Sequence, residues 1–247
     1  MSLFSQSGVS LNHMEKLSSN TIDQTCQKAL ELLDHPDWKE GKTFTEEGIY
    51  KVVTAKLHPV GAEKLPWHKR TSIHPVDRDL SYEEFRNGLL LDHTVNEQQY
   101  IPDLKHQSKI KTFREELPEV EVYLIQYKTP LGTSNREFAS LVVTNDLPVN
   151  PETSNRSFIV VQVPVLDVPV SKGYARGKYT SVEHVEEITA EDGSKSVKWT
   201  MATASTAGGA IPQVATDLAL PSQIAHDVSN FINWAKKKPS GRQTVSS

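Results

Sequence analysis

The hydrophobic positions of this chain follow a helical period near both ends and a strand period between them. From Thr21 to Asp34, apolar side chains recur every three or four residues, which predicts an amphipathic helix. A second apolar stripe between Pro212 and Lys238 predicts a longer terminal helix, and it comprises Leu218, Ile224, Val228, Phe231, Ile232 and Ala235. One helix is therefore expected before the central part of the chain and one after it.

The central part, residues 109–204, is predicted to be almost entirely strand and turn. Aliphatic residues alternate with charged and aromatic ones from Val120 to Ile125, so a strand there has one aliphatic face and one mixed face. Turn-forming residues from Pro130 to Asn135 and a β-prone run from Phe138 to Val143 complete a hairpin. Other β-prone runs cover residues 37–58, 65–73, 110–115, 158–165, 175–188 and 197–204.

A further helix is predicted after Ser81. Ser81 and Glu84 have the spacing of a capping box, and Phe85 and Leu89 follow on one helical face. The resulting order of helix, strands, helix, many strands and long helix is typical of the α+β class with a mostly antiparallel sheet. Such a sheet leaves one face open unless it curves, and the terminal helix is the expected cover.

Several motifs resemble the START family, the lipid-transfer domains related to the steroidogenic acute regulatory protein. In that family a strand ending in a Tyr-Lys-like pair leads through a Pro-containing turn to Arg-Asp-Phe and a valine-rich strand. Here Tyr127 and Lys128 precede Pro130, and the later triplet is Arg136-Glu137-Phe138, with Glu137 in the place of the usual aspartate. The order of the other motifs strengthens this local match.

Three more segments resemble START domains in order and spacing. Gly173-Tyr174-Ala175-Arg176-Gly177 occupies the place of the loop that gates the cavity in that family. Residues 197–201 resemble its penultimate strand, and 209–212 resemble its Gly-x-x-Pro step into the last helix. Taken together, the motifs resemble a fungal START-like family of undefined function.

The resemblance implies the helix-grip fold, in which a curved, mostly antiparallel sheet is wrapped on a long C-terminal helix. This START-like domain is expected to cover residues 19–238, between a disordered N-terminal segment, 1–18, and a disordered tail, 239–247, because both ends are Ser-rich and poorly patterned.

If the fold holds, strand alternation nominates the side chains that line the cavity. They are Val122, Leu124, Val142, Ile159, Val161, Val163, Val197, Trp199, Met201 and Thr203, with Ile224 and Val228 from the terminal helix. The gating loop is expected within residues 167–178, at Pro169, Gly173, Tyr174, Arg176 and Gly177. The same aliphatic set would also make an ordinary core, and that alternative stays open.

The sequence also bears on the polar groups of the cavity. Sterol-binding START members often carry a cavity arginine six residues after the first arginine of the Arg-Asp-Phe motif, and here Val142 holds that position. A charged anchor for the ligand is therefore not expected there. Gln162, Thr203 and Ser205 are neutral candidates for contact with a polar head.

Composition and charge narrow the classes of function. A chain of 247 residues can bury a sizeable core. The net charge of -4 is spread without a dominant block and gives little support to nucleic-acid binding. The lone Cys26 is expected to be a packing residue, and the N-terminus lacks the pattern of a secretory signal, so the cytoplasm is the expected location.

The sequence also lacks several catalytic and metal-binding patterns. Nine histidines are dispersed without the spacing of a zinc site, and no nucleophile elbow or phosphate-binding loop occurs. No metal, no cofactor and no catalytic residue are therefore expected. The expected function is non-catalytic binding of a hydrophobic small molecule or lipid, with transfer between membranes and transient contact with a membrane surface.

Two alternatives remain beside a lipid-binding module, while oligomeric state stays undetermined. An enzyme of the same superfold would need an ionisable pair in the cavity, for which His184 and Glu186 are the candidates, although their strand looks polar throughout. A regulatory scaffold would have a collapsed cavity. The basic triplet 236–238 could touch lipid head groups, but a helix end whose dipole favours cations is the preferred interpretation.

Overall fold

The structure is a computed structural model that describes residues 2–14, 17–129 and 133–238. The disorder expected for residues 239–247 lies outside the described residues. Within them, no helix is both long enough and apolar enough to cross a bilayer.

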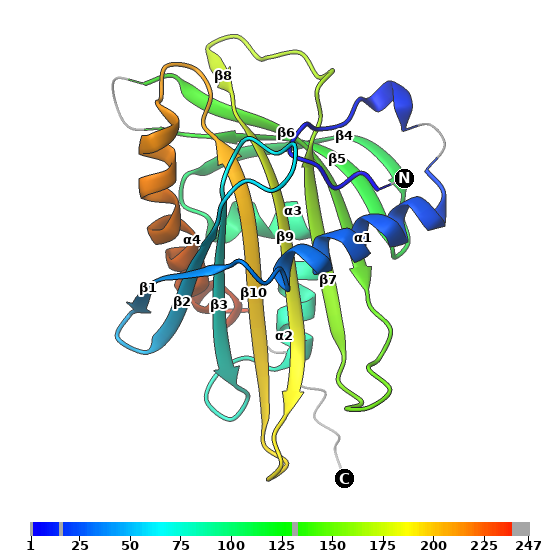
Figure 1. The fold of residues 1–247 in the computed structure, drawn as a ribbon, viewed down its shortest axis with the longest axis vertical. Helices are drawn as coiled ribbons and strands as arrows, with labels where there is room; N and C mark the ends of the chain where they lie inside the picture. The colour runs from blue at the N-terminus through cyan, green and yellow to red at the C-terminus, as the bar shows by residue number, and fades with distance from the viewer. Residues whose placement is uncertain (1, 15–16, 130–132, 239–247) are drawn as a thin grey trace.

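Ten strands of the described residues form one sheet at the centre of the molecule (Figure 1). Along the path β1-β2-β3-β10-β9-β7-β6-β5-β4 all neighbours are antiparallel, and the short β8 pairs with β6 in parallel. The strands are β1 (Lys39–Glu46), β2 (Tyr50–Leu57), β3 (Trp67–Pro75), β4 (Leu104–Arg114), β5 (Glu119–Tyr127), β6 (Asn135–Asp146), β7 (Ser157–Pro164), β8 (Tyr174–Arg176), β9 (Lys178–Thr189) and β10 (Lys195–Thr206). Strand β10 joins the two halves of the sheet, because it pairs with β3 on one side and β9 on the other.

Helices pack on both faces of this sheet. We call the face that contacts α4 the inner face and the face that contacts α1 the outer face; Figure 1 views the molecule from the outer side, with α1 crossing in front. The outer side has η1 (Leu11–His13) and α1 (Ser19–Leu33), and the inner side has α2 (Tyr82–Phe85), the π-helical turn η2 (Arg86–Leu90), α3 (His93–Tyr100) and α4 (Gln213–Ala235).

Local signals explain where the helices begin. The Ser81 hydroxyl accepts the backbone N–H of Glu84, and the Glu84 carboxylate accepts the N–H of Ser81, so the predicted capping box is confirmed. Ser18 caps α1 through the N–H of Thr21. The α+β class, with a mostly antiparallel sheet packed on a long terminal helix, is also confirmed.

The inner layer is rich in aromatic rings. Phe231 of α4 packs against Trp199 of β10 and Phe85 of α2, with ring centroids 5.2 and 5.3 Å apart. Tyr100 of α3 meets Phe231 edge-on at 5.5 Å. These contacts fix the C-terminal half of α4 to the sheet, since aromatic pairs contribute about 0.5–1.5 kcal/mol each beyond the area that they bury.

The outer layer is a second apolar core that includes α1. Ile22, Cys26 and Ala29 of α1 are buried in one cluster with Val161 and other aliphatic residues of the sheet. Burial raises the pKa of the Cys26 thiol to about 11, which keeps the thiol neutral. Cys26 therefore lies in a packing environment, away from the inner face.

The N-terminal segment is part of this outer core. The sequence predicts disorder for residues 1–18, whereas the described residues 2–14 and 17–18 run along the sheet. Phe4 is 4% exposed and stacks on Trp67 with ring centroids 5.5 Å apart, and Val9 bridges to Val165. The expectation needs this correction because a few apolar side chains in a Ser-rich segment are enough to cover a hydrophobic sheet face.

Candidate ligand cavity

A cavity of about 600 Å³ lies between the inner face of the sheet and α4. Strands β5, β6, β7, β9 and β10, helix α3 and the connection from α3 to β4 form its walls together with α4. Its apolar lining includes Ile101, Tyr127, Phe138, Tyr179, Met201, Leu220 and Ile224. A volume of this size is within the range of about 300–1,000 Å³ typical of small-molecule sites.

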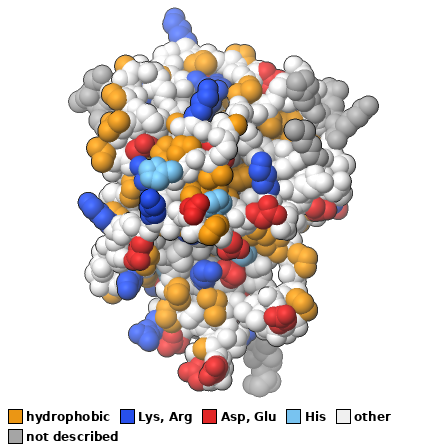
Figure 2. Space-filling model, viewed as in Figure 1, with side chains coloured by type: hydrophobic (Ala, Val, Ile, Leu, Met, Phe, Trp, Pro, Cys, Tyr) orange, Lys and Arg blue, Asp and Glu red, His pale blue; other side chains and the backbone are white. Residues whose placement is uncertain are grey.

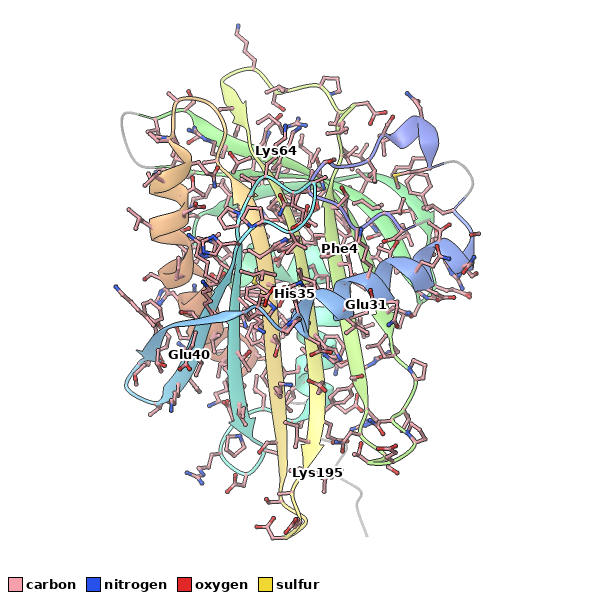
Figure 3. All side chains as sticks on the ribbon, viewed as in Figure 1. Phe4, Glu31, His35, Glu40, Lys64 and Lys195 are labelled. Carbon is pink, nitrogen blue, oxygen red and sulfur yellow. The ribbon has the colours of Figure 1, made fainter. Side chains whose placement is uncertain are left out.

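The outer face has a larger but different hollow of about 740 Å³. Phe4, Glu31, His35 and Lys64, which surround it, lie near α1 and the loop before β3 (Figure 3). Charged side chains of both signs are interspersed with apolar ones over this face (Figure 2). Because this hollow lies among surface loops, whereas the other lies between the sheet and α4, the cavity under α4 is the better candidate site.

Strand β10 follows the predicted side-chain directions. Met201 and Thr203 line the cavity, and Ser205 continues the row toward the end of the strand. Val197 and Trp199 also face inward but belong to the packed inner core. On α4, Ile224 lines the cavity and Val228 lies in the same core.

Strands β5 and β7 have the opposite orientation to the one expected. Five nominated residues belong to the outer cluster instead of the cavity: Val122, Leu124, Ile159, Val161 and Val163. The mixed face of β5, which carries Glu121 and Tyr123, is the inner one. Alternation separates two faces of a strand but does not say which faces the ligand. Here α1 provides a second apolar layer, and the aliphatic faces of β5 and β7 pack in the same cluster as α1.

Val142 also lies away from the cavity. It belongs to the inner core and contributes to a narrow pocket with His93, Glu121 and Tyr123. The neutral candidates Gln162, Thr203 and Ser205, in contrast, all line the cavity. Gln162 is fixed there because its amide lies 2.8 Å from Nε2 of His93.

Charged groups that the sequence did not nominate form the polar part of the cavity. Glu97 of α3, Glu183 of β9 and Asp227 of α4 line it. The buried Arg70 guanidinium of β3 stacks on the Trp199 ring at 3.8 Å and places Nη2 3.7 Å from Oε2 of Glu183. Glu183 also accepts a hydrogen bond of 2.8 Å from Nε1 of Trp199. Arg70 and Trp199 therefore balance the carboxylate of Glu183.

His93 is the second cation of this group. Its Nδ1 lies 2.6 Å from the carbonyl oxygen of Leu89, and its Nε2 lies 3.5 Å from Oε1 of Glu97. Burial lowers the pKa of His93, but the negative charges of Glu97 and Glu183 outweigh burial and raise it to about 9. The imidazolium form is therefore favoured at neutral pH.

The ligand atoms of His93, Glu97 and Glu183 lie within 4.8 Å of one another, a separation compatible with a metal ion. Two features disfavour that use. The Arg70 guanidinium already places a positive charge beside Glu183, and Nε2 of His93 already faces the Gln162 amide at 2.8 Å. The arrangement is better described as two ion pairs on the wall of the cavity.

Asp227 differs from the other two carboxylates. Burial raises its pKa to about 7, and Arg70 opposes this shift only in part. A carboxyl group whose folded pKa exceeds its unfolded value stabilises the fold at low pH, and this contribution is lost as the pH rises from about 4 through about 7. Asp227 in its ionised form is thus a cost to stability within the cavity wall.

We expect Asp227→Asn to stabilise the protein at about pH 8 and to have little effect at about pH 4, where the native carboxyl is protonated. The neutral amide removes the cost of the ionised form and keeps the shape of the side chain. Urea unfolding at the two pH values measures the difference. A variant less stable than the native chain at about pH 8 would contradict the assignment.

The loop of residues 167–178 is attached to the sheet by Glu137. The Glu137 side chain is fully buried, and its Oε1 accepts hydrogen bonds from Nη2 of Arg176 at 2.7 Å and from the N–H of Ser171 at 2.9 Å. Gln126 donates to Oε2 at 3.3 Å. Burial raises the pKa of Glu137, but the bonds from Arg176 and Ser171 outweigh it and lower the pKa. We call Glu137 with Arg176 the loop latch.

The other predicted loop residues lie around this latch. Tyr174 and Arg176 belong to β8, and the carbonyl of Pro169 accepts a bond from Arg176. A side chain at Gly177 would overlap the Phe138 ring, since its Cβ would lie 2.3 Å from Cε1. Gly173, with a φ of 86°, makes the turn before β8. The loop thus has a defined shape against the motif Arg136-Glu137-Phe138.

Arg136 holds the second segment at this end of the cavity. Its Nε donates to the carbonyl of Ala207 at 2.8 Å, in the connection from β10 to α4. Gly208 has a φ of 63°, and a Cβ there would lie 2.2 Å from the carbonyl oxygen of Arg176. Adjacent residues of β6 therefore secure the β8 loop and the entry to α4 together.

Two groups considered in the sequence lie elsewhere. His184 and Glu186 are 3.6 Å apart, and neither belongs to the cavity lining. At the end of α4, Lys236 lies 3.1 Å from Asp79, and Lys238 stacks on the Trp234 ring at 3.8 Å. These contacts support the interpretation of the basic triplet as a helix end.

Comparisons with known proteins support this architecture. A family model described as "Protein of unknown function (DUF3074)" matches residues 67–235, more than half of the chain. The uncharacterized protein C577.11 of Schizosaccharomyces pombe is 26% identical over 220 residues, 87% of this chain and 84% of the relative.

Solved structures with little sequence identity share the fold. Human STARD10 matches 96% of this chain and 85% of its own with a TM-score of 0.65 and 12% identity. Human StAR-related lipid transfer protein 5 matches 92% of this chain and 98% of its own, again with a TM-score of 0.65, at 14% identity. The START-like fold predicted from the sequence is confirmed.

Proposed function

The chain belongs to the family of unknown function DUF3074 and has a START-like fold, and we propose that it binds a hydrophobic ligand in the cavity under α4 and transfers it between membranes. The observation that carries this proposal is the cavity of about 600 Å³ beside a latched loop. A regulatory scaffold with a collapsed interior would be close-packed under α4, because side chains that fill such a volume gain packing energy. The volume therefore favours a ligand-binding module over a scaffold.

The cavity walls suit a ligand that is apolar over most of its length. Ile101, Met201, Leu220 and Ile224 are aliphatic or thioether side chains on its lining, and Tyr127 adds aromatic surface. Burying about 400 Å² of ligand apolar surface would contribute on the order of 10 kcal/mol before the costs of association. Such a gain is sufficient for tight binding without any covalent step.

We further propose that the chain acts without catalysis. His93 has protein partners at both ring nitrogens, since Nδ1 lies 2.6 Å from the Leu89 carbonyl oxygen and Nε2 lies 2.8 Å from the Gln162 amide. Thr203, a hydroxyl on the lining, already donates to the carbonyl of Thr180 at 3.2 Å. The pair His184 and Glu186 does not belong to the lining.

Transfer requires contact between the cavity entrance and a membrane. Val214 and Leu218, on the exposed side of the N-terminal half of α4, are 69% and 78% exposed, and Val170 in the latched loop is 53% exposed. Thr216 and Leu220 of the same half-helix line the cavity. The basic end of the helix is distant from these residues, since Lys236 lies about 27 Å farther along the helix axis than Leu218. Exposed apolar side chains at the entrance are therefore the proposed membrane contact.

We expect Leu218→Glu to slow transfer of lipid between vesicles several-fold while the amount of lipid bound at equilibrium stays the same. A carboxylate at this exposed position weakens insertion into the interface but lies outside the cavity. The measurement is fluorescence dequenching of a labelled phospholipid carried from donor to acceptor vesicles. An unchanged rate of transfer by this variant would show that the N-terminal half of α4 does not contribute to the proposed membrane contact.

Uptake from vesicles tests the proposed function itself. Purified protein, freed of bound lipid by organic extraction and refolded, is incubated with vesicles of a mixed lipid extract and then separated from them. We expect about one lipid molecule per chain in the protein fraction. Absence of lipid from a refolded, monodisperse protein would contradict the proposal.

A further inference from the structure

Asp227 is a carboxylate on the cavity wall without a counter-charge of its own. Arg70 lies 3.7 Å from Glu183, and His93 lies 3.5 Å from Glu97, so each buried cation has a carboxylate beside it. Within the described part of the chain, no hydrogen bond or ion pair reaches the Asp227 side chain. The cavity wall therefore carries one more negative group than positive groups in this cluster.

A second acceptor is unsatisfied beside it. Oε2 of Glu97 is buried without a hydrogen-bond partner among the described residues, and Glu97 lines the same cavity as Asp227. The two carboxylates are close enough for the charge of Glu97 to raise the pKa of Asp227. An unpaired buried acceptor costs about 1–3 kcal/mol, which a donor on a ligand would offset.

We propose that the cavity selects an apolar ligand whose head is a protonated amine, held by Asp227 and Glu97. This inference rests on the proposed function and deepens it by naming the chemistry of the head group. An ammonium group has several N–H donors and a positive charge, so it satisfies both acceptors and the excess negative charge together. Ile224 and Met201, on the same lining, provide contact for the apolar part.

An anionic ligand is the main rival. Arg70 is only 2% exposed, and its Nε and Nη1 atoms lack hydrogen-bond partners among the described residues. Arg70, however, is not part of the cavity lining, whereas Glu183, beside it, is. The lining includes two cations, Lys128 and Arg136, and Arg136 already donates to the carbonyl of Ala207. A ligand carboxylate would therefore meet Glu97, Glu183 and Asp227 before it reached the guanidinium.

The charged groups around Asp227 also predict how pH acts on the selection. Arg70 of β3, Glu97 of α3, Glu183 of β9 and His226 of α4 are the groups whose charges act on it. Acidification protonates the Asp227 carboxyl and removes its attraction for an ammonium group. Preference for an amine is thus expected at about pH 8 and is expected to weaken at about pH 5.

The test compares three ligands of equal chain length on the full chain after bound lipid has been removed: decylamine, decanol and decanoate. Displacement of a fluorescent apolar dye from the protein gives the dissociation constants at about pH 8. We expect decylamine to bind at least about tenfold more tightly than decanol, and decanoate to bind most weakly.

Two variants separate the role of Asp227 from general effects. In Asp227→Asn, decylamine is expected to lose its advantage while the affinity for decanol is unchanged. Asp217→Asn is the matched control, because Asp217 lies on the same helix, accepts a hydrogen bond from Gln213 and lies outside the lining. In this variant the preference for decylamine is expected to persist.

Each outcome decides something. Equal binding of decylamine and decanol, or a preference for decylamine that survives in Asp227→Asn, would overturn the inference and leave the proposed function standing. Tightest binding of decanoate would overturn it in favour of Arg70. Failure of all three ligands to displace the dye would count against the proposed function itself.

Discussion

Replacing Glu137 with glutamine is expected to lower the free energy of unfolding by about 3 kcal/mol and to speed the release of bound ligand. Glu137 is fully buried, and its carboxylate is the shared acceptor for Arg176 and Ser171. Removing one partner of a buried ion pair leaves the other charge uncompensated, a change that typically costs about 3–5 kcal/mol. Urea unfolding and the rate of dye release measure the two effects.

The design of the experiment isolates the pair. Glu137→Gln together with Arg176→Gln should be less destabilised than the sum of the two single variants, since neither charge is then left alone. Lys198→Gln is the matched control, because it breaks the partly exposed pair of Lys198 with Glu186, 2.9 Å apart. That change should stay within about 0.5 kcal/mol. Equal losses from Lys198→Gln and Glu137→Gln would show that the latch does not exist.

Ile224→Glu is expected to abolish retention of an apolar ligand and to destabilise the protein by about 3 kcal/mol. Ile224 is 3% exposed, lines the cavity, and lies one helical turn before Asp227 on α4. The new carboxylate would be desolvated and close to another negative group, and both effects are unfavourable. Circular dichroism against temperature and lipid uptake from vesicles are the measurements.

Leu218→Glu is the control for this second experiment, since it introduces the same carboxylate on the same helix at a position that is 78% exposed. It should change stability by no more than about 0.5 kcal/mol and leave the bound lipid unchanged. Normal lipid uptake by folded Ile224→Glu protein would contradict the claim that this part of α4 contacts the ligand.

The sequence predicts the architecture well because that prediction rests on periodicity and order. The α4 stripe gives the right helix, and Val228, Phe231 and Ile232 are buried as expected. Leu218 is the exception within the stripe, because its side chain is 78% exposed. A hydrophobic period identifies an apolar face, but it cannot distinguish contact with a core from contact with another surface.

The chemistry of the cavity is harder to predict, for a physical reason. Glu183 lies in a strand that looks polar throughout, yet this side chain faces inward, where Arg70 and Trp199 compensate its charge. Trp199 comes from the next strand, β10, but Arg70 comes from β3, far away in the sequence, so no local pattern marks the ion pair. Buried charges become visible only when the tertiary structure brings their partners together.

The orientation of β5 and β7 illustrates the same limit. Val122 and Val161 were expected in the cavity because aliphatic faces usually cover a ligand, but α1 and the N-terminal segment attract those faces to the outer core. The segment before α1 lacks a regular pattern, although Phe4 and Met14 are buried in the outer core. If this segment is expected to be disordered, the outer core is not foreseen. The aliphatic faces of β5 and β7 are then assigned to the cavity instead of to the outer core.

Native mass spectrometry of the purified chain is the most direct test of ligand binding in this cavity. The expected spectrum has a species heavier than the bare chain by the mass of one lipid-sized molecule, and organic extraction removes that molecule and returns the bare mass. In Ile224→Glu protein that is still folded, the heavier species should be absent. A spectrum of the bare chain alone, from protein that also takes up no lipid from vesicles, would contradict the proposed function.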